Sequence, residues 1–426
     1  MDWIAKIPAD WQTMHMKRLF SFCKGLSITK ADLVETGLPV ISYGQIHAKN
    51  NTGTRIEDHL LRYVPEICVN GNISSKVTKG DFIFADTSED LTGCGNCAYI
   101  DRDGIYAGYH SVIAKSDKEN NKYFAYLFLS DEWRKQLRTM VGGIKVFSIT
   151  QSILGRAFVI IPPIEEQERI AAYLDEKCSA IDDQVALLDK KLKAYERLKT
   201  SIINNAVTHG LNPDVEMRPS DIEWIGDIPA HWCVKRIKDL VDINNETLKD
   251  DTPLDYTFKY IDIGNVTSDG VITLSEDMTF YDAPSRARRI IHKGDVIVST
   301  VRTYLKAIAP IDFDASNIIA STGFAVLTPL AIESSFLMYL MRNSTVIDQI
   351  CSQSTGVSYP AISSSKISSI SVVIPPIDEQ RAIATYLDEK CGEIDTAIEN
   401  IGKQIDAYKR LKRSLIDEVV TGKRAV

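Results

Sequence analysis

Two long stretches of the chain carry apolar residues every three or four positions. The first runs from Glu165 to about Val207, follows Pro162-Pro163 and contains neither Gly nor Pro, which predicts one long helix. The apolar seam of this helix occupies positions d and a of a heptad repeat. Position d holds Leu174, Ile181, Leu188, Tyr195 and Ile202, and position a holds Ala171, Cys178, Val185, Leu192 and Lys199. The seam of the second stretch is Leu387, Ile394, Ile401, Tyr408, Leu415 and Cys391, Ile398, Ile405, Lys412. Such a sustained heptad seam is typical of a supercoiled helix pair.

Each predicted helix therefore has one apolar stripe that needs a partner. A helix that packs only on its own domain would also be amphipathic, and this alternative stays open at this point. We favour an antiparallel coiled coil, because two copies of one seam related by a two-fold axis would pack on each other in that direction. At about 1.5 Å per residue, about 43 residues give a rod of roughly 64 Å, so we expect a spacer.

The chain contains an internal duplication. Residues 2–11 (DWIAKIPADW) return 221 positions later as 223–232 (EWIGDIPAHW). Residues 161–167 (IPPIEEQ) and 173–178 (YLDEKC) return 213 positions later as 374–380 (IPPIDEQ) and 386–391 (YLDEKC). The segments between these motifs are much less alike. A period above 200 residues indicates duplicated domains related by an approximate two-fold axis.

The two segments between the repeated motifs, here called the inserts, are predicted to be mixed α+β domains. Short runs of β-branched residues bounded by Gly and Asp predict strands at 79–85, 260–264, 293–300 and 325–328. Helical patches follow at 122–140 and 334–352, and 209–220 has the Gly and Pro content of a linker. We therefore expect an α+β chain of two similar domains, 1–158 and 211–370, separated by two helical spacers, 159–210 and 371–426.

Composition changes this picture little. The chain has 426 residues, 44% of them hydrophobic and 25% charged, which excludes a disordered or coiled-coil-only protein. No apolar run of about 18 residues and no signal peptide is evident, so we expect a cytoplasmic protein without a membrane partner. The eight scattered cysteines indicate reduced thiols.

Charge argues against a simple DNA clamp. The net charge is −8, whereas neutralising phosphates needs clustered Lys and Arg. One cluster does exist, since residues 286–306 contain six basic residues against Asp295 alone. The acidic residues are thus spread out, and the basic residues are concentrated.

A search for catalytic motifs finds none. The Pro-Pro pairs are flanked by Ile, so they lack the Asn/Asp-Pro-Pro-aromatic motif of S-adenosylmethionine-dependent amino-methyltransferases. A phosphate-binding Gly-x-x-x-x-Gly-Lys-Ser/Thr loop is also missing from the sequence. Cys94 and Cys97 would need two more zinc ligands, such as Cys68 and His110, and two free thiols in a turn are the simpler interpretation. We expect a non-catalytic chain with no metal site.

The duplicated Pro-Pro-Ile-(Glu/Asp)-Glu-Gln motif, the heptad helix after it and the Trp-Ile-x-x-Ile-Pro-x-x-Trp opening of each half resemble the specificity subunit of type I restriction-modification systems. The resemblance covers essentially the whole chain. It implies two target-recognition domains that each read one half of a split site in double-stranded DNA, with the two helices as a ruler. The subunit itself performs no reaction.

The resemblance also implies partners. Two modification subunits would dock on the chain and methylate adenine with S-adenosylmethionine. Restriction subunits, where present, would add ATP- and Mg-dependent translocation and cleavage. No cofactor is expected on this chain.

Candidate DNA-reading residues follow from the turns and strand ends of each insert, since base edges are read by Arg, Lys, Asn, Gln and hydroxyl side chains. Those of the first insert are Gln45, His47, Lys49, Asn50, Thr87, Ser88 and Lys145. Those of the second are Asn265, Thr267, Arg286, Arg288, Arg289, Arg302, Thr303 and Lys306, with Ser358 and Tyr359 as weaker candidates. For any single position, a solvated turn residue is the competing interpretation.

Three rival functions stay open from the sequence. The chain could be a specificity subunit of another DNA modification or defence system. It could be a protein-interaction scaffold whose two domains bind proteins and whose rod spaces them. It could also be an enzyme with an unrecognised site. The basic cluster at 286–306 favours DNA, because a protein scaffold has no need of it beside a turn and a strand.

Overall fold

The computed structural model of the chain describes residues 7–117, 120–143 and 145–426, so the first part of the duplicated opening motif, residues 2–6, lies outside the described residues. The chain divides into two compact units, 1–189 with 403–426 and 190–402, here called unit 1 and unit 2. Each unit combines one variable insert with parts of both long helices. The four domain boundaries expected from the sequence remain a prediction.

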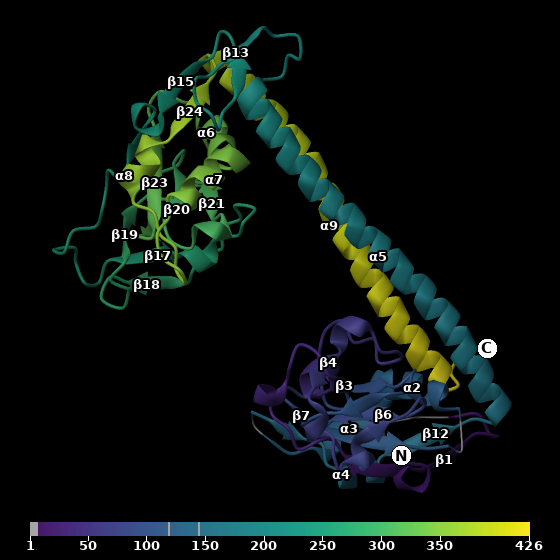
Figure 1. Ribbon diagram of the computed structural model, residues 1–426. Helices are drawn as coiled ribbons and strands as arrows, with labels where there is room; N and C mark the ends of the chain where they lie inside the picture. The colour runs from purple at the N-terminus through teal and green to yellow at the C-terminus, as the bar shows by residue number, and fades with distance from the viewer. Residues whose placement is uncertain (1–6, 118–119, 144) are drawn as a thin grey trace. The chain divides into compact units, whose positions relative to one another are not determined.

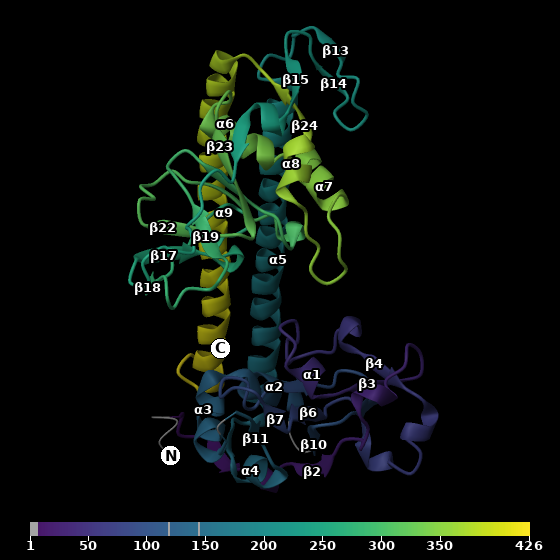
Figure 2. The same cartoon turned by 90° about the vertical axis from the view of Figure 1, so that its left-hand side faces the viewer.

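The two long helices are confirmed as α5 (Ile164–His209) and α9 (Ile377–Val420). Both views draw them side by side (Figures 1 and 2). Pro162 and Pro163 precede α5, and Gly210, with φ +78°, follows its last residue in the left-handed conformation that ends many helices. Unit 1 holds the start of α5 and the end of α9, whereas unit 2 holds the end of α5 and the start of α9, so in each unit the helices run antiparallel.

The predicted heptad seam is the surface that the helices bury. Between residues 182 and 198 of α5, only the a and d positions are shielded from solvent, and every other residue is exposed. The lysine at position a of each helix forms an ion pair with the opposite helix. Lys412 Nζ lies 2.6 Å from Asp182 in unit 1, and Lys199 Nζ lies 2.6 Å from Asp395 in unit 2. Two polar positions thus sit in equivalent places along the seam.

Unit 1 contains two four-stranded sheets. The first has the order β2 (Ser21–Lys24), β10 (Ser111–Lys115), β6 (Phe82–Ala85) and β8 (Cys97–Tyr99), all antiparallel. The second has the order β4 (Arg62–Val64), β3 (Leu38–Ile41), β9 (Ile105–Ala107) and β5 (Lys76–Val77), with β3 and β9 parallel. A short pair of β1 (Gln12–His15) and β12 (Phe158–Ile161) leads into α5.

Unit 2 repeats this topology strand for strand. Its first sheet has the order β16 (Val241–Ile243), β23 (Phe324–Pro329), β20 (Val296–Ser299) and β21 (Ile308–Pro310). Its second has the order β18 (Asp277–Thr279), β17 (Thr257–Ile261), β22 (Ile318–Ser321) and β19 (Ala287–Ile290), with β17 and β22 parallel. The pair of β15 (Cys233–Arg236) and β24 (Ser371–Ile374) leads into α9. The inserts therefore share one α+β fold despite their divergent sequences.

The predicted helical patches are each split in two. In unit 1 they form α2 (Asn121–Leu129) and α3 (Asp131–Met140), because the Ser130 side chain accepts the Trp133 N–H and starts a new helix. In unit 2, Asn343 has the same role between α6 (Ser334–Met341) and α7 (Ser344–Ser352). The remaining α-helices of the described residues are short: α1 (Tyr43–Ile46), α4 (Gln151–Arg156) and α8 (Ser364–Ser369).

Most apolar side chains of each insert form a core between sheet and helices. In unit 1, Phe82, Phe84, Phe128 and Trp133 pack with ring centroids 4.6–6.4 Å apart, and the last turns of α9 join the same core. In unit 2, the residues expected to be a linker contribute a strand instead, since β13 (Met217–Pro219) pairs with β14 (Asp227–Pro229). Among the described residues, no helix is long and apolar enough to cross a membrane.

Candidate nucleic-acid interface

Two short strands carry candidates of unit 1. β7 (Thr87–Ser88) follows β6 and pairs antiparallel with β11 (Phe147–Ser148). Lys145 lies two residues before β11 and is exposed. The pairing therefore brings the segment with Lys145 beside the segment with Thr87 and Ser88.

A hollow of about 700 Å³ opens beside these strands, and His47, Ser88, His110 and Val146 are among its lining residues. His47 Nε2 lies 2.8 Å from the Thr87 carbonyl oxygen, and its Nδ1 lies 3.0 Å from the Asn96 amide nitrogen. A neutral ring that donates from Nε2 and accepts at Nδ1 satisfies both contacts. His47 is thus held as part of the wall of the hollow.

The rim of this hollow is acidic. Glu89 and Asp90 line it, and no Lys or Arg is among its described lining residues. Hydrogen bonds from the Thr92 hydroxyl and then from the Gly93 N–H lower the pKa of the exposed Asp90 carboxyl group. Asp90 is therefore a carboxylate at neutral pH. A carboxylate at this place can accept a hydrogen bond from the exocyclic amine of cytosine.

Gln45 and Asn265 have the same local task in the two units. Gln45 Oε1 accepts the Ser42 N–H (3.0 Å), and Asn265 Oδ1 accepts the Asp262 N–H (3.0 Å). Both contacts belong to a capping box, in which the residue three positions after the capping residue bonds back to it. Each amide thus has its oxygen occupied and its NH₂ group left to contact a ligand.

The remaining candidates of unit 1 lie away from the hollow. Lys49 and Asn50 are exposed, and neither lines it. Asn50 Nδ2 lies 2.5 Å from His59 Nε2. The structure therefore groups Thr87, Ser88 and His47 around one hollow, with Lys145 next to it, and leaves Lys49 and Asn50 on a separate surface.

Unit 2 gathers five candidates in two adjoining loop segments, residues 302–306 and 357–359, here together called the tip. Arg302 follows β20 and stacks on the Tyr359 ring, with 4.7 Å between its Cζ and the ring centroid. The backbone N–H of Arg302 donates to the Pro360 carbonyl (2.7 Å), which holds the two segments together. Lys306 and Ser358 are exposed, whereas Thr303 is buried with its Oγ1 3.0 Å from Ser354 Oγ. Thr303 is thus a support of the tip.

The backbone of the tip is held in an uncommon conformation. Arg302 and Lys306 have φ of +50° and +53°, on either side of a short 3-10 turn at Thr303–Leu305. Left-handed φ values in residues other than Gly cost free energy and cluster at functional sites. The conformation presents two cations and a stacked Tyr to solvent.

The three arginines at β19 differ in their surroundings. Arg286 is exposed and donates Nη2 to Asp262 Oδ2 (2.6 Å). Arg288 packs its guanidinium over the Phe280 ring, with Cζ 4.5 Å from the centroid. Arg289 follows a bulge in the pairing of β19 with β22, and burial lowers its pKa. Arg286 is therefore the most accessible of the three, and it lies beside the turn of Asn265.

Thr267 lies on an exposed turn of unit 2. Its Oγ1 accepts the Val271 N–H (3.1 Å), which closes the turn between Val266 and Ile272. This is a local structural contact of the hydroxyl oxygen, and the hydroxyl proton stays available.

The loops of the two units occupy the same place in the topology. β6 and β20 are the third strands of equivalent sheets, and the residue after each donates its N–H across the sheet, Asp86 to His110 and Thr300 to Gly323. The β7–β11 pair of unit 1 then corresponds to the bridge between Val301 and Ala361 in unit 2. The acidic hollow and the basic tip are therefore two versions of one loop system.

Sequence reasoning missed several residues of these surfaces. Glu89, Asp90 and His110 line the hollow of unit 1. Tyr304 and Val357 are exposed at the tip of unit 2. For Glu89, Asp90 and Tyr304, a usable signal was their position shortly after the strands predicted at 79–85 and 293–300. His110 was considered from the sequence only as a possible zinc ligand, and nothing in the sequence distinguished Val357.

The cysteine alternative gains no support from the geometry. Cys94 and Cys97 are buried in the apolar core of unit 1, and burial raises the pKa of Cys97 to about 12. Such a thiol stays protonated at neutral pH, as expected for a cysteine packed in an apolar core. Within the part of the chain that the structure describes, no three His, Cys, Asp or Glu residues are arranged to hold a metal ion.

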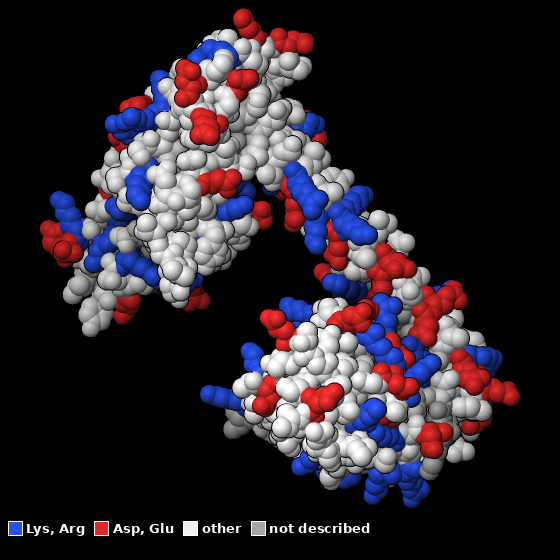
Figure 3. Space-filling view, viewed as in Figure 1, with Lys and Arg blue, Asp and Glu red and all other residues white. Residues whose placement is uncertain are grey.

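Charge on the visible face is mixed. Figure 3 shows Lys and Arg beside Asp and Glu over both units and along the helices. Local charge, not net charge, therefore distinguishes one loop from another.

Comparison with known proteins agrees with this organisation. Residues 8–194 and 229–405 match the family described as type I restriction modification DNA specificity domain. The MjaVIII specificity subunit of Methanocaldococcus jannaschii, a type I restriction enzyme subunit, is 21% identical over 98% of this chain and 94% of its own length. The StySPI specificity subunit of Salmonella potsdam is 20% identical over 98% of this chain and 90% of its own.

Solved structures show the same fold. A chain from a structure on complex assembly and conformational transition of the type I R-M system has a TM-score of 0.70 at 18% identity, covering 99% of this chain and 100% of that one. The HsdS subunit from Thermoanaerobacter tengcongensis has a TM-score of 0.51 at 18% identity, with 99% of each chain covered.

Proposed function

Because this chain belongs to the family of type I restriction-modification DNA specificity subunits, and is a non-catalytic member of that system, we propose that its two units each read one half of a split site in double-stranded DNA. Unit 1 reads with the loops around its acidic hollow. Unit 2 reads with its tip and with Arg286. The helices α5 and α9 set the distance between the two half-sites.

One observation carries this proposal. Both inserts have the same strand order in both sheets, yet the loop after the third strand is acidic in unit 1 and basic in unit 2. A scaffold that bound the same partner twice would keep the same side chains at these loops. A reader of two different half-sites needs one scaffold with different donors and acceptors.

The partners follow from the same proposal. Two modification subunits, which use S-adenosylmethionine to methylate adenine, dock on the frame that the two halves share, namely the repeated motifs and the helices α5 and α9. Restriction subunits supply the ATP- and Mg-dependent steps. The acidic net charge of this chain is tolerable if these subunits surround the duplex and make most of the phosphate contacts. Its DNA substrate places the complex in the cytoplasm.

The test is the methylome of the host with and without this gene, while the modification subunits are expressed. We expect methylation to disappear at one split motif with a constant gap between its halves. The control is the same strain complemented with the intact gene, which should restore that motif. An unchanged methylome in the deletion strain would contradict the proposal.

A further inference from the structure

A second hollow in unit 1 is lined by four arginines. Its volume is about 590 Å³, and it lies between α3 and the end of α9. The arginines are Arg134 and Arg138 of α3 and Arg410 and Arg413 of α9, and they face two carboxylate residues, Asp131 and Asp417. The lining residues therefore carry a net positive charge of about two, in a chain whose total charge is −8.

One buried donor of these arginines has no acceptor within the described part of the chain. Arg138 pairs through Nη1 with Asp131 (2.8 Å), but its buried Nε has no hydrogen-bond partner. Arg134 uses Nε and Nη1 for the Phe128 carbonyl (2.9 Å) and Asn96 Oδ1 (2.7 Å). A buried guanidinium without enough acceptors is costly unless a ligand completes its hydrogen bonds.

The two arginines of α9 are free to bind. Arg413 donates Nε to the Lys409 carbonyl at a long 3.4 Å, and among residues 7–117, 120–143 and 145–426 neither Arg410 nor Arg413 forms an ion pair. Both are exposed. Planar guanidinium groups gathered in this way match the oxygens of a phosphate.

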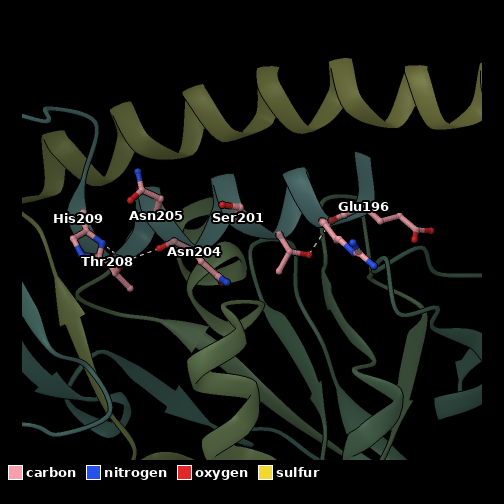
Figure 4. Close-up of a pocket in the computed structure, with 8 residues that line it drawn as sticks. Glu196, Ser201, Asn204, Asn205, Thr208 and His209 are labelled. Atoms are coloured by element: carbon pink, nitrogen blue, oxygen red, sulfur yellow. Dashed lines mark hydrogen bonds between the residues drawn. The ribbon is translucent and has the colours of Figure 1, made fainter. Parts of the chain in front are cut away.

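The equivalent surface of unit 2 is different. Positions 213 residues away from the arginines hold Arg197 and Thr200 on α5 and Ile347 and Cys351 on α7. The hollow on that face of α5 has a volume of about 580 Å³, and hydroxyl and amide side chains dominate it, including Ser201, Asn204 and Asn205 (Figure 4). A partner that docked in the same way on both units would meet one arginine here and four in unit 1. The occupant of the arginine hollow is therefore specific to unit 1.

The arginine hollow also adjoins the candidate base-reading hollow. Thr92 lines both of them. Asn96 joins them as well, because it accepts from Arg134 and contacts His47. DNA brought to the acidic rim of Glu89 and Asp90 would carry its phosphates toward a surface that lacks Lys and Arg among its described lining residues. The four arginines line the hollow that shares Thr92 with this one.

We propose that the hollow formed by Arg134, Arg138, Arg410 and Arg413 binds a backbone phosphate of the DNA duplex that flanks the half-site read by unit 1. This inference rests on the proposed function and adds a phosphate contact from the helical frame to it. The contact fixes the register of unit 1 on the duplex and carries no sequence information. Unit 2 has its own exposed cations at the tip and does not need this contact.

The test uses the full chain assembled with its modification subunits, and measures the affinity for the methylated motif between low and high salt. Arg410→Gln with Arg413→Gln should reduce the slope of log K against log salt by about 1 and weaken binding roughly tenfold at about 0.1 M salt. The loss of affinity should be the same for DNA duplexes of unrelated sequence. The sequence of the motif that becomes methylated should not change. Both residues are exposed and Gln is a good helix former, so the fold is retained.

Two further variants sharpen the test. Arg197→Gln, at the position equivalent to Arg410, is the matched control and should leave slope and affinity unchanged. Asp417→Asn removes a carboxylate from the hollow and should strengthen DNA binding several-fold by the same charge argument. Opposite effects of the two charge changes on DNA affinity are the signature of a phosphate site.

Three results would overturn the inference. The double variant could keep the wild-type slope and affinity. It could lose its modification subunits in co-purification with the slope unchanged, which would make the hollow a docking site for an acidic protein segment. It could alter binding of inorganic phosphate at constant ionic strength without altering DNA binding. A wild-type complex that binds the split motif no better than unrelated duplex would instead contradict the proposed function itself.

Discussion

Gln167 of unit 1 and Gln380 of unit 2 make the same two hydrogen bonds at the start of the long helices. Each accepts a backbone N–H from the residue that precedes the insert helices, Asn120 (3.0 Å) or Glu333 (2.9 Å). Each donates to the carbonyl of the first proline of its Pro-Pro pair, at 2.9 Å. The repeated motif is thus a joint between helix and insert.

Other contacts of the joint are duplicated in the same way. Tyr126 donates to Asp175 in unit 1, and Tyr339 donates to Asp388 in unit 2. The burial of each Tyr, and then its hydrogen bond to the Asp, raise its pKa well above the usual value, so both hydroxyls remain donors. The loops after β6 and β20, in contrast, share their backbone position and none of their charge.

The difference between joint and loops teaches where each part of the sequence is constrained. The joint must hold the helices at one angle to each insert, which needs the same buried hydrogen bonds twice. The loops contact something outside the chain, so their side chains are free to differ. Breaking one joint should therefore affect stability, and changing one loop should affect recognition.

The largest effect is expected at the joints. Gln167→Ala and Gln380→Ala each leave a buried N–H and a buried carbonyl without a partner, which should cost about 2–4 kcal/mol of local unfolding free energy. Hydrogen exchange should show the loss around residue 120 for the first variant and around residue 333 for the second, with equal size. Gln184→Ala, on the exposed face of α5, is the control and should change little. Unequal losses would show that the two joints are not equivalent.

The next effect is expected at the tip of unit 2. Arg302→Ala should lower the affinity for the methylated motif about 10- to 100-fold and relax one half-site, because it removes the exposed cation that stacks on Tyr359. Ser88→Ala, at the equivalent position of unit 1, should leave the half-site that Arg302→Ala relaxes unchanged. Tyr359→Phe keeps the aromatic ring, so this variant should bind DNA nearly as wild type. Methylome sequencing reads both half-sites in one experiment. Relaxation of both half-sites by Arg302→Ala would contradict separate readers.

The sequence was sufficient for the frame and for the type of fold. A heptad seam needs only the identity of residues on one helix face, and the lysines at position a were visible in both copies. Their ion pairs with Asp182 and Asp395 could not be predicted, because the sequence does not show which lysine of the opposite helix lies next to a given carboxylate. The identical strand order of the inserts also escaped prediction, since the strands share buried positions and few residue identities.

The candidate interface was predicted less completely. Gln45 and Asn265 were predicted as turn residues, each following a glycine, Gly44 or Gly264, and the structure shows each turn to be a capping box. Stacking of Arg302 on Tyr359 joins residues far apart in sequence, so only the fold reveals it. The arginine hollow combines α3 with α9 in the same way. Sites built from distant segments leave no pattern in a single sequence.

A smaller, pH-dependent effect is expected where the joints differ. Asp417 Oδ1 accepts the Asp131 N–H (2.8 Å), and Asn204 Oδ1 accepts the Ser344 N–H (2.9 Å) at the equivalent place in unit 2. Burial raises the pKa of Asp417, only partly opposed by the backbone hydrogen bonds from Asp131 and Glu132. The folded state therefore binds the proton of the Asp417 carboxyl group more tightly than the unfolded state does. The stability that this protonation contributes is lost as the pH rises through the pKa of Asp417 in the folded state.

Asp417→Asn should accordingly be more stable than wild type at pH 7 and lose that advantage at pH 4. Asn204→Asp should import the same pH dependence into unit 2. The measurement is the unfolding free energy of the full chain at both pH values. A difference between Asp417→Asn and wild type that is the same at pH 4 and pH 7 would show that burial of this carboxyl does not matter.

The central claim, that two separate readers are spaced by α5 and α9, has one direct test. Deleting one heptad from each helix, 185–191 and 403–409, keeps both lysine ion pairs and removes about 10 Å of helix. Methylome sequencing of a host that expresses this variant with its modification subunits should show both half-sites unchanged and the gap shortened by about three base pairs. Methylation at the original gap, or at altered half-sites, would contradict the account.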